Sequence, residues 1–158
     1  MEQKVFLDSP VGKLTLVETD GKLSFIQLSS HFNPADLPEI LSPVLLETKK
    51  QLQEYFDGTR QKFDLPLSPQ GTPFQSQVWQ ALLKIPYGET RSYQQIASMV
   101  GNPKACRAVG SANGKNPIMI LIPCHRVITA GGKIGGYAGG LPMKKALLEL
   151  ETKRRSLL

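Results

Sequence analysis

The stretch RSYQQIASMVGNPKACRAVGSANGKN, residues 91–116, decides how the second half of the chain folds. Its Ser-x-x-Gln sequence is a capping box and predicts a helix over residues 92–100. Gly101 ends that helix, and the Asn-Pro pair that follows predicts a second helix over residues 102–113. Two short helices joined by a turn that contains glycine are typical of a helix-turn-helix motif.

The predicted second helix is basic on one face. The basic residues on it or beside it are Arg91, Lys104, Arg107 and Lys115. Several of its other residues are alanine, glycine or serine, so the helix can approach the phosphate backbone of a duplex closely. These features favour DNA binding, although plain helical hairpins also occur in proteins that bind no DNA.

Helices and glycine-rich turns fill the rest of the second half. We expect a helix over residues 73–85, whose apolar residues are four positions apart, and a final helix over residues 141–153 with a leucine face. The glycines within residues 126–140 allow tight turns, the close approach of a ligand, or a flexible wing hairpin. We therefore predict a mainly α C-terminal domain of helix-turn-helix or winged-helix type over residues 71–158.

The first half is predicted to be a small α/β domain over residues 1–70. Near-alternating apolar residues predict three strands, with an Asp-Gly hairpin turn between the second and third. These strands span residues 4–9, 13–19 and 22–28. A helix is expected over residues 42–58, because a Ser-Pro pair starts the segment and a glycine ends it. Residues 61–68 are expected to form one more short strand.

The boundary between the two halves is predicted at SPQGTP, residues 68–73, which consists of turn-forming residues. The charge of the chain changes sign there. Residues 1–70 carry a net charge of −3, whereas residues 71–158 carry a net charge of +9. A basic half of this kind favours a polyanionic partner such as nucleic acid, or a solvated surface that aids solubility.

The composition excludes several classes of protein. With 158 residues and 41% hydrophobic content, the chain can bury a core and is not disordered throughout. Its longest apolar run, residues 118–122, is far shorter than the ~20 residues of a membrane helix, and its start does not resemble a secretory signal. We expect a soluble protein of the cytoplasm, associated with the nucleoid if the source is bacterial.

The two cysteines and two histidines could in principle hold one metal ion, but their spacing argues against it, because structural zinc sites usually have two pairs of ligands a few residues apart. The chain has only Cys106, Cys124, His31 and His125, and adjacent residues such as the pair at 124 and 125 chelate one tetrahedral metal poorly. We expect no metal and no other cofactor. Cys106 has no histidine near it in the sequence and is interpreted as a packing residue.

Cys124 and His125 form the candidate chemical centre, within NPIMILIPCHRVITAGG, residues 116–132. The thiolate is the nucleophilic form of cysteine, and an ordinary thiol, with a pKa of about 8.5, is only slightly ionised at neutral pH. A histidine that takes the proton, held by a glutamate of the last helix or by the Asn116 amide, would activate it. The same residues also fit a Cys-His hydrolase or acyltransferase, and a cysteine after an apolar run is often simply buried.

Three segments resemble one known family. NPIMILIPCHRVI, SYQQIASMVGNPKACRAVGSANGKNP and GGYAGGLPMKKALLELE are similar to parts of the O6-alkylguanine-DNA alkyltransferases, also called methylated-DNA–protein-cysteine methyltransferases. The resemblance covers nearly all of residues 72–152, and the first half resembles in kind that family's small ribonuclease-H-like sheet with a helix. It implies a DNA-repair enzyme that moves an alkyl group, such as methyl, from O6-alkylguanine in double-stranded DNA to its own cysteine and is thereby irreversibly inactivated.

The resemblance implies a catalytic set of four residues. Cys124 accepts the alkyl group, and His125 deprotonates it through a water. Glu151 polarises His125. Asn116 braces the turn that leads to the cysteine. The product is a thioether, so each molecule is expected to act once.

The resemblance also implies a set that contacts DNA and the damaged base. Tyr93 donates a hydrogen bond to the base and crowds the phosphate, and Arg107 fills the gap left in the stack by the flipped nucleotide. The other members of this set, expected to line the base pocket or contact the substrate, are Val127, Tyr137, Ala138 and Arg126. The motif is expected to enter the minor groove without sequence preference, as a monomer. Relatives that only sense alkylated bases lack the cysteine, so a non-catalytic sensor is the weaker alternative.

Overall fold

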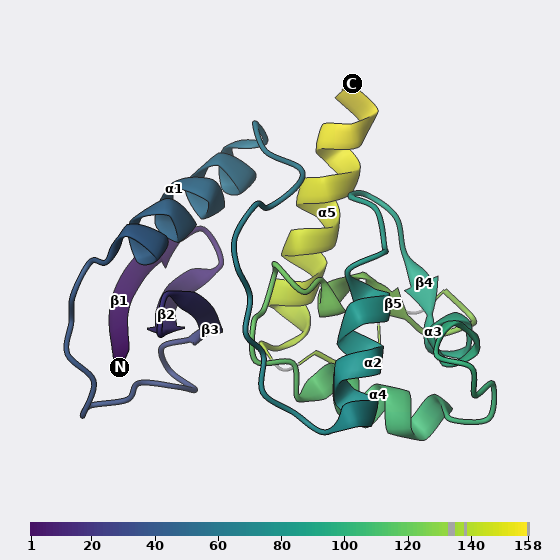
Figure 1. Ribbon diagram of the computed structural model, residues 1–158. Helices are drawn as coiled ribbons and strands as arrows, with labels where there is room; N and C mark the ends of the chain where they lie inside the picture. Colours follow the sequence, from purple (N-terminus) through teal and green to yellow (C-terminus); the bar gives the residue numbers. More distant parts are fainter. Residues whose placement is uncertain (133–134, 138, 158) are drawn as a thin grey trace. The chain divides into compact units, whose positions relative to one another are not determined.

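The computed structural model describes residues 1–132, 135–137 and 139–157, with side chains described as far as residue 153. The chain divides into two compact units, Met1–Gln70 and Gly71–Leu158, which are distinguished by colour in Figure 1. Each unit has its own set of buried apolar side chains. The predicted fold class, an α/β part followed by a mainly α part, is confirmed.

The first unit is built on an antiparallel sheet with the strand order β1-β2-β3. Its strands are β1 (Glu2–Ser9), β2 (Gly12–Thr19) and β3 (Lys22–Leu28). Asp20 and Gly21 join β2 to β3, and their φ angles of 52° and 82° are both positive, as a two-residue turn of type I′ requires. The predicted Asp-Gly hairpin is therefore confirmed.

Helix α1 (Pro43–Asp57) covers one face of this sheet (Figure 1). The Ser42 hydroxyl accepts a hydrogen bond from the backbone N–H of Leu45, which satisfies one of the free donors at the start of the helix. Gly58 ends the helix in the left-handed conformation, with φ 82°. Leu45, Leu52 and Tyr55 are fully buried on the inner face of the helix, so its local signals and its packing agree.

The predicted strand over residues 61–68 is wrong. Only one bridge forms there, between Leu23 and Leu67, in which the Pro66 carbonyl accepts from the Leu23 N–H at 2.9 Å and the Ser68 N–H donates to the Leu23 carbonyl at 2.8 Å. Pro66 has no N–H to donate to a strand ladder, so the pairing does not extend.

The second unit consists, in its described part, of helices and one short pair of parallel strands. These elements are α2 (Pro73–Leu82), β4 (Arg91–Ser92), α3 (Tyr93–Met99), α4 (Cys106–Gly114), the 3-10 turn η1 (Cys124–Arg126), β5 (Val127–Ile128) and α5 (Leu141–Leu157). Helix α2 packs against α3 and α4, and α5 packs against η1. In the described part of the chain, no helix combines the length and apolar character that a membrane crossing needs.

Helices α3 and α4 form the predicted helix-turn-helix, and the capping box at its start is confirmed. The Ser92 hydroxyl accepts from the Gln95 N–H at 3.0 Å, while the Gln95 side chain accepts from the Ser92 N–H at 2.8 Å. Gly101, with φ 81°, ends α3. Helix α4 begins at Cys106, four residues later than predicted, because Asn102 and Pro103 start a β-turn that the Ala105 N–H closes on the Asn102 carbonyl at 3.0 Å.

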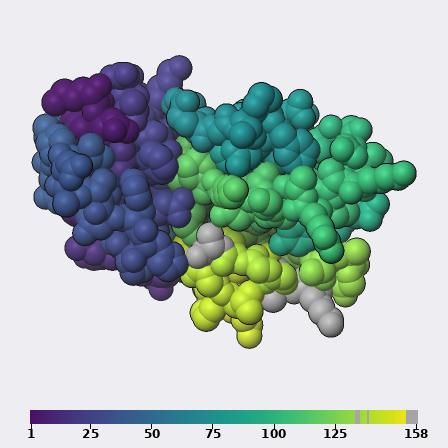
Figure 2. Space-filling model, turned by 90° about the horizontal axis from the view of Figure 1, so that it is seen from below, coloured from purple at the N-terminus to yellow at the C-terminus, as the bar shows by residue number. Residues whose placement is uncertain are grey.

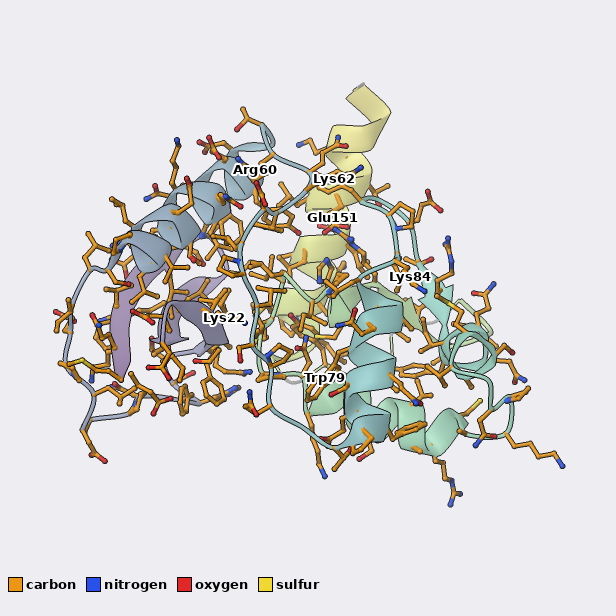
Figure 3. All side chains as sticks on the ribbon, in the orientation of Figure 1. Lys22, Arg60, Lys62, Trp79, Lys84 and Glu151 are labelled. Carbon is orange, nitrogen blue, oxygen red and sulfur yellow. The ribbon has the colours of Figure 1, made fainter. Side chains whose placement is uncertain are left out.

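Trp79 fixes α4 against α2. Its ring nitrogen donates to the Ala112 carbonyl, in the last turns of α4, at 2.9 Å, and the side chain is only 1% exposed. Figure 3 labels Trp79 on α2. A Cβ atom on Gly71 would lie 2.4 Å from the Trp79 ring, so only glycine allows the chain to pass this close.

Replacing Ser92 by alanine is expected to lower the free energy of unfolding of the second unit by about 1 kcal/mol, since the helix loses its N-cap acceptor. Urea denaturation followed by the fluorescence of Trp79, the sole tryptophan of the chain, measures this change. Ser98→Ala, an exposed position in the same helix, is the matched control, with a change expected within ~0.5 kcal/mol. Equal losses in the two variants would contradict the capping role.

Candidate active site

Cys124 lies at the start of η1, where a buried turn ends. Residues 118–122 are all buried, and they form tight turns rather than a helix or a strand. Ile120 has φ 74°, a left-handed conformation that β-branched residues rarely adopt, so its surroundings hold the backbone in a strained state. The Cys124 side chain is only 2% exposed, and a reactant must therefore enter the unit to reach the thiol.

Two buried asparagine amides hold this turn. Asn116 donates to the Ile122 carbonyl at 2.7 Å and accepts from the Ile118 N–H at 3.0 Å, so its side chain spans the turn. Asn113, on α4, donates to the carbonyl of Cys124 at 3.3 Å. A bracing role was predicted for Asn116 but not for Asn113, which links the helix-turn-helix directly to the cysteine.

His125 and Arg126 share one buried carboxylate, that of Glu151. The Nε2 atom of His125 lies 2.6 Å from one oxygen of Glu151. Arg126 donates from Nε to the other oxygen at 2.8 Å and from Nη2 to the first at 3.1 Å. The Gly88 N–H donates to the carboxylate at 3.2 Å. Glu151 comes from α5 (Figure 3), and it joins that helix to η1 and to the loop after α2.

The protonation states of this cluster follow from burial and charge. Burial acts to raise the pKa of Glu151, but the hydrogen bonds and charges of His125 and Arg126 outweigh it and hold that pKa far below its usual range. Burial lowers the pKa of His125, Glu151 acts to raise it, and the charges of Arg126 and Lys144 lower it further. The imidazole is therefore neutral at neutral pH. Among the described residues its Nδ1 has no hydrogen-bond partner, and with Nε2–H donated to Glu151 this atom can accept a proton.

Lys144 belongs to the site, and the sequence analysis missed it. Its side chain on α5 is fully buried, and its ammonium donates to the carbonyls of Val127 at 2.6 Å and Gly136 at 3.0 Å. Burial lowers the pKa of Lys144 to about 8. Lys144 and Glu151 are seven residues apart, two turns of the helix, on the face that also buries Leu147. The sequence signal that could have identified Lys144 and Glu151 together is the presence of two charged residues on the apolar face of one helix.

The charge of Lys144 bears directly on the thiol. Burial raises the pKa of Cys124, whereas the Asn116 amide, the Lys144 charge and the Tyr137 hydroxyl act to lower it. Burial alone would keep the thiol protonated, so these three groups set how readily a thiolate can form.

Tyr93 and Tyr137 are brought to the same site as Cys124. Tyr93 is the first residue of α3, and burial and the charge of Cys124 both raise its pKa. Burial and the charge of Cys124 likewise raise the pKa of Tyr137. A Cβ atom on Gly135 would lie 3.3 Å from the Tyr93 hydroxyl and 3.5 Å from the Lys144 ammonium, so the glycine-rich segment passes close to both groups.

The remaining predicted pocket residues differ in their surroundings. Val127 is buried in β5, and its carbonyl accepts the hydrogen bond from Lys144. Ala138 lies outside the described residues.

Cys106 is half-buried at the start of α4, with its thiol 3.9 Å from the side-chain oxygen of Gln94. No group of three or more His, Cys, Asp or Glu that could hold a metal ion occurs in residues 1–132, 135–137 and 139–157.

Arg107 is exposed on α4 and is not part of the buried cluster. Lys104 and Lys115 are also exposed on or beside the same helix. Figure 2 shows the segment that contains α3 and α4, in green, at the surface of its unit. The structure thus separates a basic surface on α4 from the buried thiol, with Asn113 between them.

That Arg126 contacts the substrate or DNA stays a prediction, and the structure places this residue in the buried cluster. The residue is 6% exposed, and besides its bonds to Glu151 it donates from Nη1 to the Ile85 carbonyl at 2.7 Å. Its guanidinium also lies 5.8 Å from the centre of the Tyr87 ring. A guanidinium in this position compensates the charge of a buried carboxylate.

Both units of the chain match domains of known proteins. Residues 4–69 match the model of the 6-O-methylguanine DNA methyltransferase, ribonuclease-like domain, and residues 73–153 match that of the 6-O-methylguanine DNA methyltransferase, DNA binding domain. A methylated-DNA–protein-cysteine methyltransferase of Methanosarcina acetivorans is 46% identical over 147 residues, which cover 91% of this chain and 94% of the relative.

Solved structures of a Mycobacterium tuberculosis protein are similar to this chain over nearly its whole length. The crystal structure of the Mycobacterium tuberculosis O6-methylguanine methyltransferase superposes with a TM-score of 0.89 at 46% identity, covering 98% of this chain and 94% of that one. A crystal structure of Mycobacterium tuberculosis OGT in complex with DNA gives a TM-score of 0.88 at 46% identity, covering 97% of this chain and 93% of that one.

Glu151→Gln is expected to lower the free energy of unfolding at pH 7 by about 3 kcal/mol, because it leaves the Arg126 charge buried without its carboxylate. The pKa of Glu151 is lower in the folded state than the ~4.3 of an unfolded glutamate, so its contribution is complete above about pH 5 and is lost as the pH falls. The difference between wild type and variant should therefore narrow below about pH 4.

Urea denaturation at pH 7, 5, 4 and 3 tests this expectation. Glu149→Gln, an exposed glutamate on the same helix, is the matched control and should show no comparable loss at pH 7. A difference between wild type and Glu151→Gln that stays constant over the whole pH range would mean that the carboxylate charge does not stabilise the fold.

Proposed function

Because the chain belongs to the O6-methylguanine DNA methyltransferase family, we propose that it repairs DNA by moving the alkyl group of O6-alkylguanine to its own Cys124. One observation carries the assignment of the acceptor. Cys124 is buried, the residue after it is a neutral histidine that a carboxylate holds in place, and the Asn113 amide of α4 donates to the Cys124 carbonyl.

The reaction is a displacement at the alkyl carbon. The Cys124 thiol gives up its proton, through a water, to Nδ1 of His125, whose Nε2–H is held by Glu151. The thiolate forms the C–S bond while the bond between carbon and O6 breaks. The guanine, which gains the hydrogen bond of Tyr93 as it leaves, takes up one proton overall, and this balances the proton that the thiol has lost.

Lys144 and Asn116 support the thiolate in this scheme. The Lys144 ammonium places a positive charge near the sulfur in a buried site of low dielectric, where a fixed charge acts strongly. Asn116 keeps the turn before Cys124 in its strained conformation. The product is a thioether, which an imidazole and a carboxylate cannot cleave, so each molecule acts once.

The surface of α4 binds the DNA. A stacked guanine cannot reach a buried thiol, so the nucleotide must leave the duplex, at a cost of a few kcal/mol. Arg107 fills the gap in the base stack, and Tyr93, at the start of α3, crowds the phosphate of the extruded nucleotide. Lys104 and Lys115 contact phosphates, which hold the protein without selecting a sequence. In this account α4 enters the minor groove, and one protein molecule acts alone on each lesion.

The test is an intact-mass measurement after the protein is mixed with a short duplex that carries one O6-methylguanine. A gain of one methyl group, located at Cys124 by peptide mapping, is expected. Selective binding of the lesion with no change of mass would indicate a sensor of damage. If there is neither transfer nor selectivity, Cys124 and His125 would instead fit a hydrolase or acyltransferase.

Cys124→Ala is expected to abolish methyl transfer while the affinity for duplex DNA stays within about twofold, since the substitution removes only a buried sulfur. Mass spectrometry measures the transfer, and a gel-shift titration measures the binding. Cys106→Ala is the matched control, because it removes the other cysteine and should leave the transfer intact. Transfer that persists in Cys124→Ala would show that another residue is the acceptor.

Arg107→Ala is expected to slow transfer from duplex DNA by at least about tenfold, because part of the extrusion cost of a few kcal/mol is no longer offset. Reaction with free O6-methylguanine should change little. Single-turnover kinetics at saturating protein measure both rates. Lys115→Ala, which removes a phosphate contact near the end of the same helix, is the control and should recover its rate at saturation. Equal slowing of Arg107→Ala on duplex and free base would argue against its role in extrusion.

A further inference from the structure

We propose that Arg126 is a positioning residue for the reaction: it keeps Glu151 in one orientation and keeps His125 neutral, so that His125 can accept the proton of Cys124. This inference rests on the proposed alkyl transfer and adds to it a residue that touches neither the DNA nor the alkyl group.

The hydrogen bonds of Arg126 fix the orientation of the Glu151 carboxylate. Arg126 binds both oxygens of Glu151 with its planar fork, at 2.8 and 3.1 Å, and its third bond, to the Ile85 carbonyl at 2.7 Å, anchors the guanidinium to the loop after α2. The carboxylate cannot rotate without breaking one of these bonds. One of its oxygens therefore stays directed at Nε2 of His125, 2.6 Å away.

The charges around the imidazole explain why the arginine is needed. A histidine paired with a bare buried carboxylate is stabilised as imidazolium, and an imidazolium cannot accept a proton from the thiol. The groups near His125 and Cys124 come from several elements: Arg126 on η1, Lys144 and Glu151 on α5, Tyr93 on α3, and Tyr137 between β5 and α5.

Two of these groups are cations and one is an anion. Protonating His125 would place a third positive charge in a buried cluster that holds a single carboxylate, which low dielectric makes unfavourable. If Arg126 were absent, the imidazolium would pair with Glu151 as its main partner. The charge of Arg126 thus opposes the effect that Glu151 has on the histidine, while its hydrogen bonds keep Glu151 in place.

A purely structural arginine predicts a different result from a charge-setting one. Loss of a structural contact would slow the reaction by the same factor at every pH. Loss of the charge would raise the pKa of His125, so that the neutral imidazole exists only at higher pH, and the acidic side of the pH profile of transfer would move upward with it.

The experiment compares Arg126→Met and Arg126→Gln, which remove the charge, with Arg126→Lys, which keeps it but loses the forked bonds. Second-order rate constants for methyl transfer from a duplex with one O6-methylguanine are measured from pH 5.5 to 8.5. In the two neutral variants, we expect the acidic side of the pH–rate profile to shift to higher pH by about one pH unit. Arg126→Lys should lower the rate by a similar factor at each pH. Arg60→Met, in the first unit, is the matched control and should match wild type.

The second measurement follows His125 directly, by 15N NMR of protein labelled at histidine. The chain has only two histidines, and His31 is exposed, so the variant His31→Gln assigns both signals. In the wild type the His125 ring should titrate below the ordinary range of histidine, and in Arg126→Met it should titrate at least about one pH unit higher. If Arg126→Met does not fold, Arg126→Gln, whose amide can still donate to Glu151, provides the same comparison.

Each outcome bears on a separate claim. An unshifted titration of His125 together with a pH-independent loss of rate would overturn the role of Arg126. If the wild type transfers no methyl group at all, the proposed function fails, whereas the NMR titration still decides whether Arg126 keeps the histidine neutral.

Discussion

The buried carboxylate of Glu151 is the constraint on which the second unit depends. A charge removed from water is tolerated only when hydrogen bonds and opposite charges compensate it. Here the compensation comes from His125 and Arg126 on η1 and from the Gly88 N–H. Because α5 supplies the carboxylate, satisfying this one group fixes three segments, far apart in the sequence, around the thiol of Cys124.

The turn before Cys124 adds a second constraint, which connects the surface to the thiol. Ile120 is held at positive φ, and the Asn116 amide closes the turn from within. Asn113 extends from α4 to the carbonyl of Cys124, and α4 is itself held by the ring nitrogen of Trp79. The helix that presents Arg107 at the surface is therefore joined by one hydrogen bond to Cys124 and by another to the buried Trp79. This continuity gives a physical route by which contact with DNA and the position of the nucleophile depend on each other.

Local chemistry could be predicted from the sequence, whereas most of the buried long-range pairing could not. The capping box at Ser92 and the Asp20-Gly21 hairpin depend on neighbouring residues alone, and both were predicted correctly. The pairing of His125 with a glutamate of the last helix was also anticipated, because few acids occur in the second half. The burial of Arg126 was not foreseen, since long charged side chains usually lie at the surface and nothing local indicates that one is buried.

Lys144 and the segment near Pro66 are two further places where the sequence did not predict the structure. Lys144 was overlooked because its partners, the carbonyls of Val127 and Gly136, are backbone groups that any sequence carries. A strand was expected over residues 61–68, but strand pairing also needs donors, and Pro66 lacks one. In both cases the missing information was which backbone groups meet in space.

The central claim is that one cysteine accepts one alkyl group and is then spent. The most direct measurement uses a duplex with a 13C-labelled methyl group at O6 of a single guanine, in several-fold excess over protein, followed by NMR until the reaction stops. We expect a signal of S-methylcysteine at one equivalent per protein, after which the remaining labelled DNA is unchanged. Continued loss of label from the DNA beyond one equivalent, or label in methanol rather than in the protein, would contradict it.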